Sequence, residues 1–405
     1  MLKNVDFDIL VIRDYYPSVN NPSSSTWVYN QVASLQEMGY KPLVISPAPF
    51  NPLKKIFRER FQLYDNPSLE YENYLNTTVI RPPYFKVPRN KLKGTTLHCL
   101  SKVILKYGNL NSIKLIHAHF GQNGVAALSL KENLRVPLIT SFYGFDSGRL
   151  GQLFKPYYKD LISKGDLFLA LSDNMKSDLL KLGFPEEKIL IHRLGIDTSR
   201  FDVHSATGNE FIMLTVARLD ETKGVQYVIK ALHQFFQLHP DTKKKIIYKI
   251  VGGGSYESEL KKLVSNLNLS DQIVFFNNLL VKNGREIVIS EMQNCDIFLL
   301  CSSTIKSGGK EGTPVVLMEA QACGKPCIST FHAGIPEVVL NNKTGILVNE
   351  RSVEEIKNAI SLMYFDSEKR KSFGENAREH ILSVYNQSKR MAELKQLYDR
   401  FIKSE

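Results

Sequence analysis

The chain has 405 residues, of which 43% are hydrophobic and 23% are charged, a balance that excludes intrinsic disorder and allows two or three domains with their own cores. The formal net charge is +11, and residues 1–200 hold 26 Lys and Arg against 17 Asp and Glu, whereas residues 201–405 hold 26 against 24. A positive N-terminal half attracts polyanions such as nucleic acids, anionic lipids or phosphorylated small molecules. A basic surface that only keeps the protein soluble explains the charge equally well.

Short apolar runs punctuate the chain from its start. The first, FDILVI, reads as a β-strand, because a signal peptide needs a longer apolar region and a small-residue cleavage site. The later runs are PLVIS, TTVIR, IKLIHAHF, PLITSFYG, DLFLALS and KILIHRL, then FIMLTVAR, IIYKIVGGG, QIVFFNNL, DIFLLCS, KPCISTF and GILVN. Helix-like segments separate them, and this alternation indicates parallel sheets covered on both faces. The sequence therefore predicts two α/β units in series.

Three other segments complete the organisation. Residues 194–210 are turn-rich without a strong period, which makes them the expected join between the units. Residues 353–405 read as helical throughout. Residues 50–110 are rich in Lys, Arg, Pro and aromatic residues, and 54–64 is expected to form an amphipathic helix. Such a helix lies on an anionic membrane or, more commonly, packs on the sheet with its basic side chains in water. No run of 18 apolar residues occurs, so no membrane-spanning helix is expected.

The segment GKEGTPVVLMEAQACGKPCIST at 309–330 carries the densest set of chemical groups. Glu311 and Glu319 are separated by seven residues, and a Gly-Thr-Pro turn between them precedes a helix-forming stretch. Backbone N–H groups at the positive end of such a helix favour a phosphate. Glu319 would lie further inside the helix, near enough to accept hydrogen bonds from sugar hydroxyls, and Glu311 would face the ligand from the loop.

Two cations follow the strand FIMLTV. Arg218 and Lys223 lie five residues apart in VARLDETKG, at the carboxyl end of the strand, where open α/β sheets bind ligands. They could neutralise a departing diphosphate, although a salt-bridged Arg and a surface Lys would be the ordinary interpretation of the pair alone. The glycine turn VGGGSYESEL is a weaker signal, because it also serves as a plain strand-to-helix connection.

Metal chemistry has little support in the sequence. His117 and His119 alternate on an expected strand and therefore project to one face, but no third ligand lies nearby in sequence. The five cysteines form no CxxC pair, so we expect reduced, mostly buried thiols of a cytosolic protein. We therefore expect no metal site, and His117 is expected to pack or hydrogen-bond in the sheet.

The segment with Glu311 and Glu319 closely resembles the E-x7-E motif of the family 4 retaining glycosyltransferases, and EGTPVVLMEA is similar to the version in bacterial exopolysaccharide enzymes of the colanic-acid type. Further landmarks fall in the family order across most of the chain: HAHFG, TSFYGFD, LGIDTSRF, VARLDETKG, VGGGSYESEL and AGIPEVV. A lone pair of glutamates would mean little, whereas the ordered set is specific.

The resemblance implies the GT-B fold, an α/β architecture in which two Rossmann-like domains face each other across a cleft. It implies an acceptor-binding domain at 1–195, a nucleotide-sugar-binding domain at 196–384, and a last helix at 385–405 that returns to the first domain. The implied activity is metal-independent, retaining hexosyl transfer from a UDP- or GDP-sugar, without a cofactor, to a saccharide or lipid-linked acceptor in cell-surface polysaccharide biosynthesis. The implied location is cytoplasmic or peripheral on the inner face of the plasma membrane.

The resemblance also assigns roles to residues of this chain. Glu311 orients the sugar, His119 approaches the donor sugar, and Arg218 and Lys223 hold the diphosphate. The full nucleotide-sugar set is Arg218, Lys223, Gly252, Gly253, Gly312, Thr313, Pro314, Val315 and Glu319, and the acceptor-side set is Ser25, Thr26, Tyr143 and Asp146.

Two positions depart from the family pattern. Tyr143 stands where many relatives have the His of an HGxD sequence, so no general base is assigned there. Residues 23–26, Ser-Ser-Ser-Thr, replace a Gly-Gly loop, and the neighbouring Trp27 could stack on a sugar ring or belong to the core.

Two alternatives stay open at this point. A GT-B epimerase or phosphorylase would share the fold. A non-catalytic protein that binds nucleic acid or a membrane through its basic surface would explain the +11 charge, but the sequence has no RNP-like, helix-turn-helix or zinc-finger signature.

Overall fold

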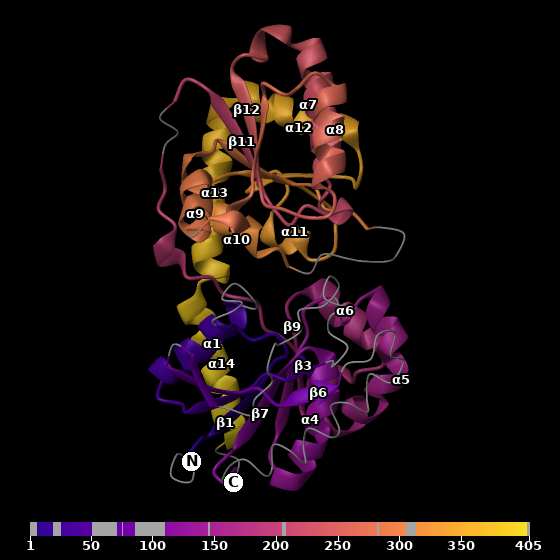
Figure 1. Ribbon diagram of the computed structural model, residues 1–405, viewed down its shortest axis with the longest axis vertical. Coiled ribbons are helices and arrows are strands. Elements are labelled where there is room, and N and C mark those ends of the chain that lie inside the picture. Colours follow the sequence, from indigo (N-terminus) through magenta and orange to yellow (C-terminus); the bar gives the residue numbers. More distant parts are fainter. Residues whose placement is uncertain are drawn as a thin grey trace. The chain divides into compact units, whose positions relative to one another are not determined.

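The structure, a computed structural model, describes residues 6–18, 26–50, 71–74, 76–85, 110–144, 146–204, 208–281, 283–304 and 313–402. The chain divides into two compact units (Figure 1). The first comprises residues 1–170, 175–192 and 391–405, and the second comprises residues 171–174 and 193–390. The expected amphipathic helix at 54–64 lies outside the described residues.

The first unit is built on an eight-stranded sheet with the order β10-β9-β8-β7-β1-β2-β5-β4. Its neighbours pair in parallel except β4 and β5, which are antiparallel. The seven apolar runs that predicted strands in this half all form strands, and the short edge strand β4 and a two-stranded ribbon of β3 and β6 were not foreseen. The bounds are β1 Ile9–Ile12, β2 Pro42–Ile45, β3 Ala48–Phe50, β4 Tyr71–Tyr74, β5 Thr77–Ile80, β6 Pro83–Phe85, β7 Leu115–His119, β8 Leu138–Ser141, β9 Leu167–Ala170 and β10 Ile189–Ile191.

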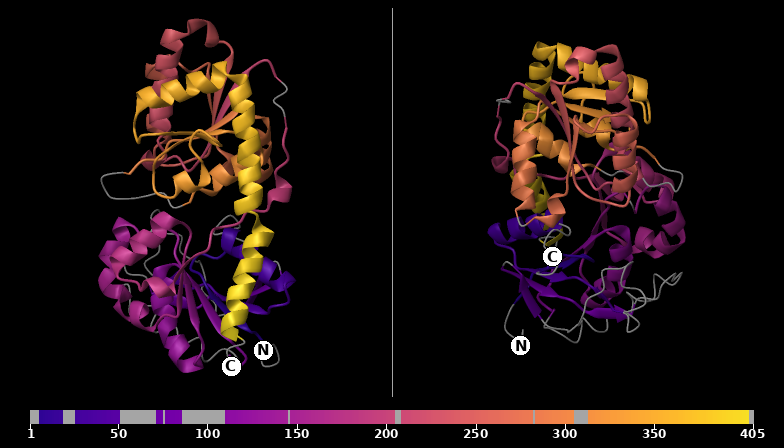
Figure 2. Two further views of the ribbon diagram at one scale, coloured as in Figure 1. Left: turned by 180° about the vertical axis from the view of Figure 1, so that it is seen from behind. Right: turned by 45° about the horizontal axis from the view of Figure 1, so that its top comes forward.

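Helices cover both faces of this sheet. One face carries α1 (Thr26–Glu37) and the last part of α14 (Gln387–Ile402), which runs along the sheet in Figure 2. Val28, Val32, Leu394 and Tyr398 of these two helices belong to one buried cluster with the strand residues. The other helices of this part of the chain are α4 (Gly121–Leu134), α5 (Arg149–Lys164) and α6 (Asp173–Leu182).

The second unit is built on a six-stranded, wholly parallel sheet with the order β13-β12-β11-β14-β15-β16. All six apolar runs that predicted strands here are confirmed. The bounds are β11 Phe211–Val216, β12 Ile246–Val251, β13 Ile273–Phe276, β14 Ile297–Leu300, β15 Cys327–Thr330 and β16 Gly345–Val348.

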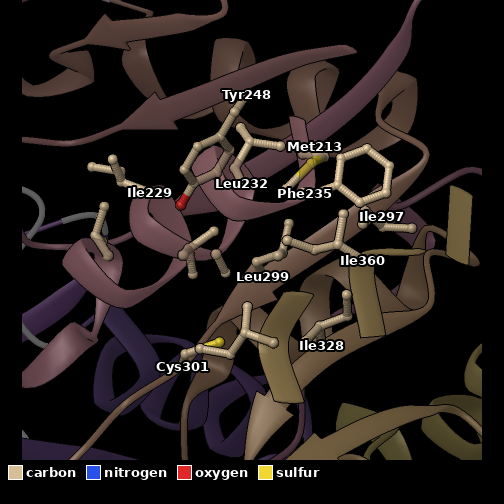
Figure 3. Packing of buried hydrophobic residues seen from close by; sticks show 14 of the residues in the cluster. Met213, Ile229, Leu232, Phe235, Tyr248, Ile297, Leu299, Cys301, Ile328 and Ile360 are labelled. Carbon is tan, nitrogen blue, oxygen red and sulfur yellow. The ribbon is translucent and has the colours of Figure 1, made fainter. Parts of the chain in front are cut away.

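Two buried clusters fill the faces of this second sheet. The first contains residues of α7 (Val225–Leu238), α8 (Glu257–Asn266) and α12 (Val353–Phe365), and Figure 3 shows Phe235 of α7 and Ile360 of α12 packed against strand residues such as Met213. The second contains residues of α9 (Gly284–Asn294), α10 (Val315–Ala322), α11 (Ile335–Val338) and α13 (Ser367–Val384). Burial on both faces explains why these strands read as continuous apolar runs.

Residues 353–402 are helical, as expected, with breaks between α12 and α13 at Asp366 and between α13 and α14 at Tyr385 and Asn386. Asp366 ends one helix and caps the next, because its side chain accepts a hydrogen bond from the Lys369 N–H. Among the described helices, none combines the length and apolar character that crossing a bilayer requires. Cys295, Cys301, Cys323 and Cys327 are buried free thiols, as predicted.

Each sheet reverses its strand order at one point, between β1 and β7 in the first unit and between β11 and β14 in the second. Loops that leave the carboxyl ends of the strands diverge there, which is where open α/β sheets bind ligands.

Candidate functional site

In the first unit, polar side chains gather where β1 and β7 end. Arg13 and Asp14 follow β1 and form an ion pair, and the Arg13 guanidinium lies 4.3 Å from the centre of the Phe120 ring after β7. Asn123 of α4 donates from Nδ2 to Asp14 Oδ1 (2.9 Å). These contacts join the two loops at the reversal point. No motif in the sequence indicated Arg13, Asp14 or Asn123, although the first two directly follow an apolar strand, where ligand-binding residues are common.

His119 ends β7 and is buried. Its Nδ1 lies 2.6 Å from the Tyr143 hydroxyl, and its ring stacks on that of His117 with 4.3 Å between ring centres. Burial lowers the pKa of His119 well below its ordinary value, and the positive charge of Arg13 acts in the same direction. His119 is therefore a neutral imidazole, suited to donating or accepting a hydrogen bond.

His117 hydrogen-bonds inside the unit, as predicted. Its Nδ1 lies 2.5 Å from the Tyr398 hydroxyl of α14, and its Nε2 lies 2.7 Å from Ser141 Oγ at the end of β8. Burial lowers the pKa of His117 to about 3. Both ring nitrogens form hydrogen bonds within the unit. His117 therefore supports the neighbouring site residues and does not itself offer a nitrogen to a ligand.

Asp146 lies deeper than its acceptor-side assignment suggests. The side chain is fully buried, and its oxygens accept hydrogen bonds from the Gly121 N–H (2.7 Å) and the Tyr143 N–H (2.9 Å). Burial raises the pKa of this carboxyl to about 6, against the opposite effect of these backbone hydrogen bonds. Asp146 therefore holds the loops after β7 and β8 together.

One further acceptor-side residue lies at the start of α1. Thr26 is the first residue of α1, and Ser25 lies outside the described residues. The next residue, Trp27, is half-buried, with its ring 6.1 Å from that of Tyr143 and 5.9 Å from the Arg13 guanidinium carbon. Trp27 thus lies beside Tyr143, the hydrogen-bond partner of His119.

In the second unit, Arg218 and Lys223 belong to the loop that follows β11, which we call the Arg218 loop (217–224). Arg218 Nε donates to Asp220 Oδ2 (2.7 Å), and the Arg218 side chain is 78% exposed. Burial would raise the pKa of Asp220, but hydrogen bonds from Thr222 and Arg218 outweigh it and hold the pKa below its usual range. The salt-bridge interpretation of Arg218 is correct, and the exposed guanidinium keeps donors for an anion.

Lys223 ends a short turn fixed against β14. The next residue, Gly224, has φ +69°, and a Cβ there would lie 1.8 Å from the Cys301 carbonyl oxygen. The Ser303 N–H donates to the Thr222 carbonyl (2.8 Å). The turn that carries Lys223 is thereby fixed to the end of β14, beside the loop that leads to α10.

The glycine turn after β12 supports the same loop. Gly252 has φ +139°, and a Cβ there would lie 1.9 Å from the Ala217 carbonyl oxygen. The Leu219 N–H also donates to the Gly253 carbonyl (3.0 Å). Gly252 and Gly253 therefore position the Arg218 loop through close backbone packing, a role that requires glycine at 252.

The E-x7-E motif is described from Thr313 onward, and Glu311 and Gly312 lie outside the described residues. Pro314 caps α10, Val315 begins it, and the buried Thr313 hydroxyl has no hydrogen-bond partner in the described part of the chain. Glu319 is buried within α10 and forms an ion pair with Arg285 at the start of α9. Arg285 donates to both carboxylate oxygens, one bond being 3.2 Å from Nη1 to Oε2.

No feature of the sequence indicated Arg285. It lies 34 residues before Glu319, in another helix and outside every motif, so no spacing in the sequence connects the two. Its guanidinium carbon also lies 5.8 Å from the centre of the Phe201 ring, which helps to fix it in place.

Residues 24–200 match the family Glycosyltransferase Family 4, and residues 197–380 match the family Glycosyl transferases group 1. Together the two matches cover the whole second sheet and every strand of the first sheet except β1.

Several curated proteins are similar in sequence. The chain is 30% identical over 365 residues to the amylovoran biosynthesis glycosyltransferase AmsK of Erwinia amylovora, covering 82% of this chain and 86% of that protein. It is 36% identical over 277 residues to WcaL of Salmonella typhimurium, named as a colanic acid biosynthesis glycosyltransferase. That second match covers 67% of this chain and 66% of WcaL, so the chain spans slightly less than two thirds of WcaL.

Solved structures share the fold. HepE of Anabaena in complex with UDP superposes with a TM-score of 0.73 at 16% identity, covering 97% of this chain and all 100% of that one. Sucrose-phosphate synthase of Thermosynechococcus elongatus gives 0.75 at 18% identity, with 98% and 100% coverage. The fold is GT-B, as the resemblance implied.

Proposed function

Because the chain belongs to the family 4 glycosyltransferases, we propose that it transfers a sugar from a nucleoside diphosphate sugar to a saccharide acceptor in the biosynthesis of an exported or cell-surface polysaccharide. The relatives named for colanic acid and amylovoran biosynthesis support the polysaccharide class. Family membership does not favour the epimerase, phosphorylase or nucleic-acid-binding alternatives.

One observation carries the proposal for the donor site. At the reversal point of the second sheet, the Arg218 loop is fixed to the end of β14 by the bond from Ser303 to Thr222, and the same strand leads to α10. The two cations follow the carboxyl end of β11, and the N-terminus of α10 follows that of β14. Their positive charge complements the negative charge of a diphosphate. In this proposal Arg218, Lys223 and the first N–H groups of α10 hold the diphosphate, and Glu319 accepts hydrogen bonds from the ribose hydroxyls.

The proposed reaction proceeds with retention of the anomeric configuration and without a metal ion. Breaking the bond between the sugar and the diphosphate leaves negative charge on the leaving group and positive charge on the sugar ring. Arg218 and Lys223 would stabilise the first, and Glu311 the second, while the acceptor hydroxyl attacks from the same face as the leaving group and gives its proton to the departing phosphate oxygen. His119 would approach the donor sugar, and the loops around Tyr143 and Trp27 would form the acceptor side.

The donor is proposed to be a UDP- or GDP-sugar, and UDP is the first probe because HepE, which shares the fold, binds UDP. Isothermal titration with UDP, GDP and their sugars should show micromolar binding by the full chain. Lys223→Ala should weaken it at least tenfold, and Lys261→Ala, which removes an exposed cation of α8 paired with Glu257, should leave it unchanged. Equal binding by both variants would refute this donor site.

We also propose that the acceptor is lipid-linked and that the basic N-terminal half contacts the cytoplasmic face of a membrane. Residues 1–200 carry nine more Lys and Arg than Asp and Glu, 26 against 17, whereas donor binding uses cations of the other half. Anionic vesicles should therefore sediment the protein at low salt and release it at high salt. Protein that stays in the supernatant with anionic vesicles at low salt would contradict membrane contact.

A further inference from the structure

Five polar side chains of the first unit form a continuous cluster, which we call the histidine cluster: His117, His119, Ser141, Tyr143 and Tyr398. Tyr143 is half-buried and the other four are buried. The five residues come from β7, the end of β8, the loop after it, and α14. The bonded pairs are Tyr398 with His117 Nδ1 (2.5 Å), His117 Nε2 with Ser141 (2.7 Å), and Tyr143 with His119 Nδ1 (2.6 Å). A neutral histidine has one N–H, so the direction of each bond decides which nitrogen is protonated.

The direction is determined first at Tyr398. This side chain is fully buried, and among the described residues the hydrogen-bond partner of its hydroxyl is His117 Nδ1. Burial raises the pKa of Tyr398 well above its ordinary value, so the hydroxyl keeps its proton and must donate it. His117 therefore accepts at Nδ1 and carries its proton on Nε2, from which it donates to Ser141 Oγ.

The direction of the hydrogen bond between Tyr143 and His119 follows in the same way. Tyr143 is likewise neutral, because burial raises its pKa against the opposite effects of Arg13 and Ser141. A neutral phenol is a good donor and a poor acceptor, whereas the unprotonated imidazole nitrogen accepts well. The Tyr143 hydroxyl therefore donates to His119 Nδ1.

We propose that Tyr143 is a positioning residue that holds His119 as the tautomer protonated on Nε2. This tautomer offers an N–H donor from the end of β7, at the reversal point of the sheet. Its consequence for catalysis rests on the proposed function: His119 donates a hydrogen bond to an oxygen of the donor sugar and does not act as a base. Tyr143, which replaces an imidazole of the HGxD pattern, supplies the hydroxyl that fixes this arrangement.

The tautomer is measured directly from the side-chain ¹⁵N shifts of the full chain labelled on histidine, with His117 and His119 assigned from single-site variants. In the native protein, both residues should show a pyrrole-type Nε2 and a pyridine-type Nδ1. A pyrrole-type Nδ1 on His119 would overturn the proposal without reference to any enzyme assay.

Tyr143→Phe removes one oxygen and should shift the His119 signals to averaged values while leaving those of His117 in place. Tyr398→Phe is the matched control, because it removes a hydroxyl from the same cluster and should change His117 instead. His119 signals that are unaltered in a folded Tyr143→Phe protein would overturn the proposal.

Activity supplies a separate readout. Tyr143→Phe should lower kcat about threefold to tenfold with the KM for the nucleotide sugar within about twofold, since the contact acts mainly as the bond breaks. If the native tautomer is as stated but no nucleotide sugar is turned over, the proposed function fails and the positioning role stands. If sugar is transferred but His119 is protonated on Nδ1, the positioning role of Tyr143 fails and the proposed function stands.

Discussion

Arg285 of α9 holds the carboxylate of Glu319 in α10 by hydrogen bonds to both of its oxygens. The glutamate is buried, whereas the Arg285 side chain is 42% exposed. A two-point contact fixes the plane of a carboxylate and supplies the opposite charge that a buried anion requires. Carboxylate oxygens accept more than one hydrogen bond, so Glu319 keeps acceptor capacity for the ribose hydroxyls of the proposed donor.

Removing Arg285 should therefore destabilise the folded state, because the buried Glu319 carboxylate loses its ion-pair partner. We expect Arg285→Ala to lower the free energy of unfolding by on the order of 2 kcal/mol, a value reduced for the exposure of Arg285. The double variant Arg285→Ala, Glu319→Gln should recover most of this loss, because no unpaired carboxylate remains. Urea unfolding of the single and double variants measures the coupling.

The exposed pair of Lys261 and Glu257 on α8 is the control for this experiment. Lys261→Ala should change the unfolding free energy by no more than about 0.5 kcal/mol. If Arg285→Ala costs no more than Lys261→Ala, the buried pair is unimportant for stability and the positioning of Glu319 needs another explanation.

Gly252→Ala should displace the Arg218 loop. The added Cβ would lie 1.9 Å from the Ala217 carbonyl oxygen, at a φ of +139° that other residues rarely adopt. We expect a loss of on the order of 3 kcal/mol in unfolding free energy, together with weaker UDP binding by titration calorimetry. Gly208→Ala is the control, since the nearest atom to its added Cβ would be 3.8 Å away. If Gly252→Ala and Gly208→Ala have equal unfolding free energies and equal affinities for UDP, the Arg218 loop does not depend on the close packing of Gly252 against Ala217.

Stability should fall as the pH is lowered from about 6.5. Burial depresses the pKa of His117 from 6.5 to about 3, so in this window the unfolded chain binds a proton that the folded chain does not. His119 acts in the same direction, and Asp146, with its pKa raised from 3.8 to about 6, opposes them between those two values. Each histidine contributes a slope of about 1.4 kcal/mol per pH unit.

His117→Gln should therefore reduce the slope of unfolding free energy against pH by about 1.4 kcal/mol per unit between pH 6 and pH 4.5, although it lowers stability at pH 7. The measurement is urea unfolding across this range. His233→Gln, at a histidine whose bond to Gln237 is exposed, should leave the slope unchanged. A slope unaffected by His117→Gln would mean that His117 titrates alike in the folded and unfolded states.

Glu311→Ala should reduce turnover by two orders of magnitude or more with little change in the unfolding free energy. In the proposed mechanism, Glu311 acts on charge that develops at the sugar as the bond breaks, so its removal mainly affects the transition state. Initial-rate kinetics with saturating nucleotide sugar check this. Near-normal turnover by the purified variant would remove Glu311 from the mechanism.

The strands were predictable because both sheets are covered on two faces, which makes each strand a continuous apolar run. The two strands of the β3 and β6 ribbon have three residues each, too short to produce such a run. In the site, local motifs indicated Arg218, Lys223 and Glu319, because all three belong to short segments that are recognisable in the sequence, VARLDETKG and the E-x7-E motif. Arg285 and Tyr398 were missed because their roles depend on contacts across the fold, 34 and 281 residues from their partners.

The proposed reaction is retaining transfer from a nucleoside diphosphate sugar. The most direct test incubates the purified chain with a panel of α-linked UDP- and GDP-sugars and a lipid-linked saccharide acceptor, and reads the anomeric proton coupling of the product by NMR. We predict a new glycosidic bond with the α configuration of the donor. A β-linked product would contradict transfer with retention.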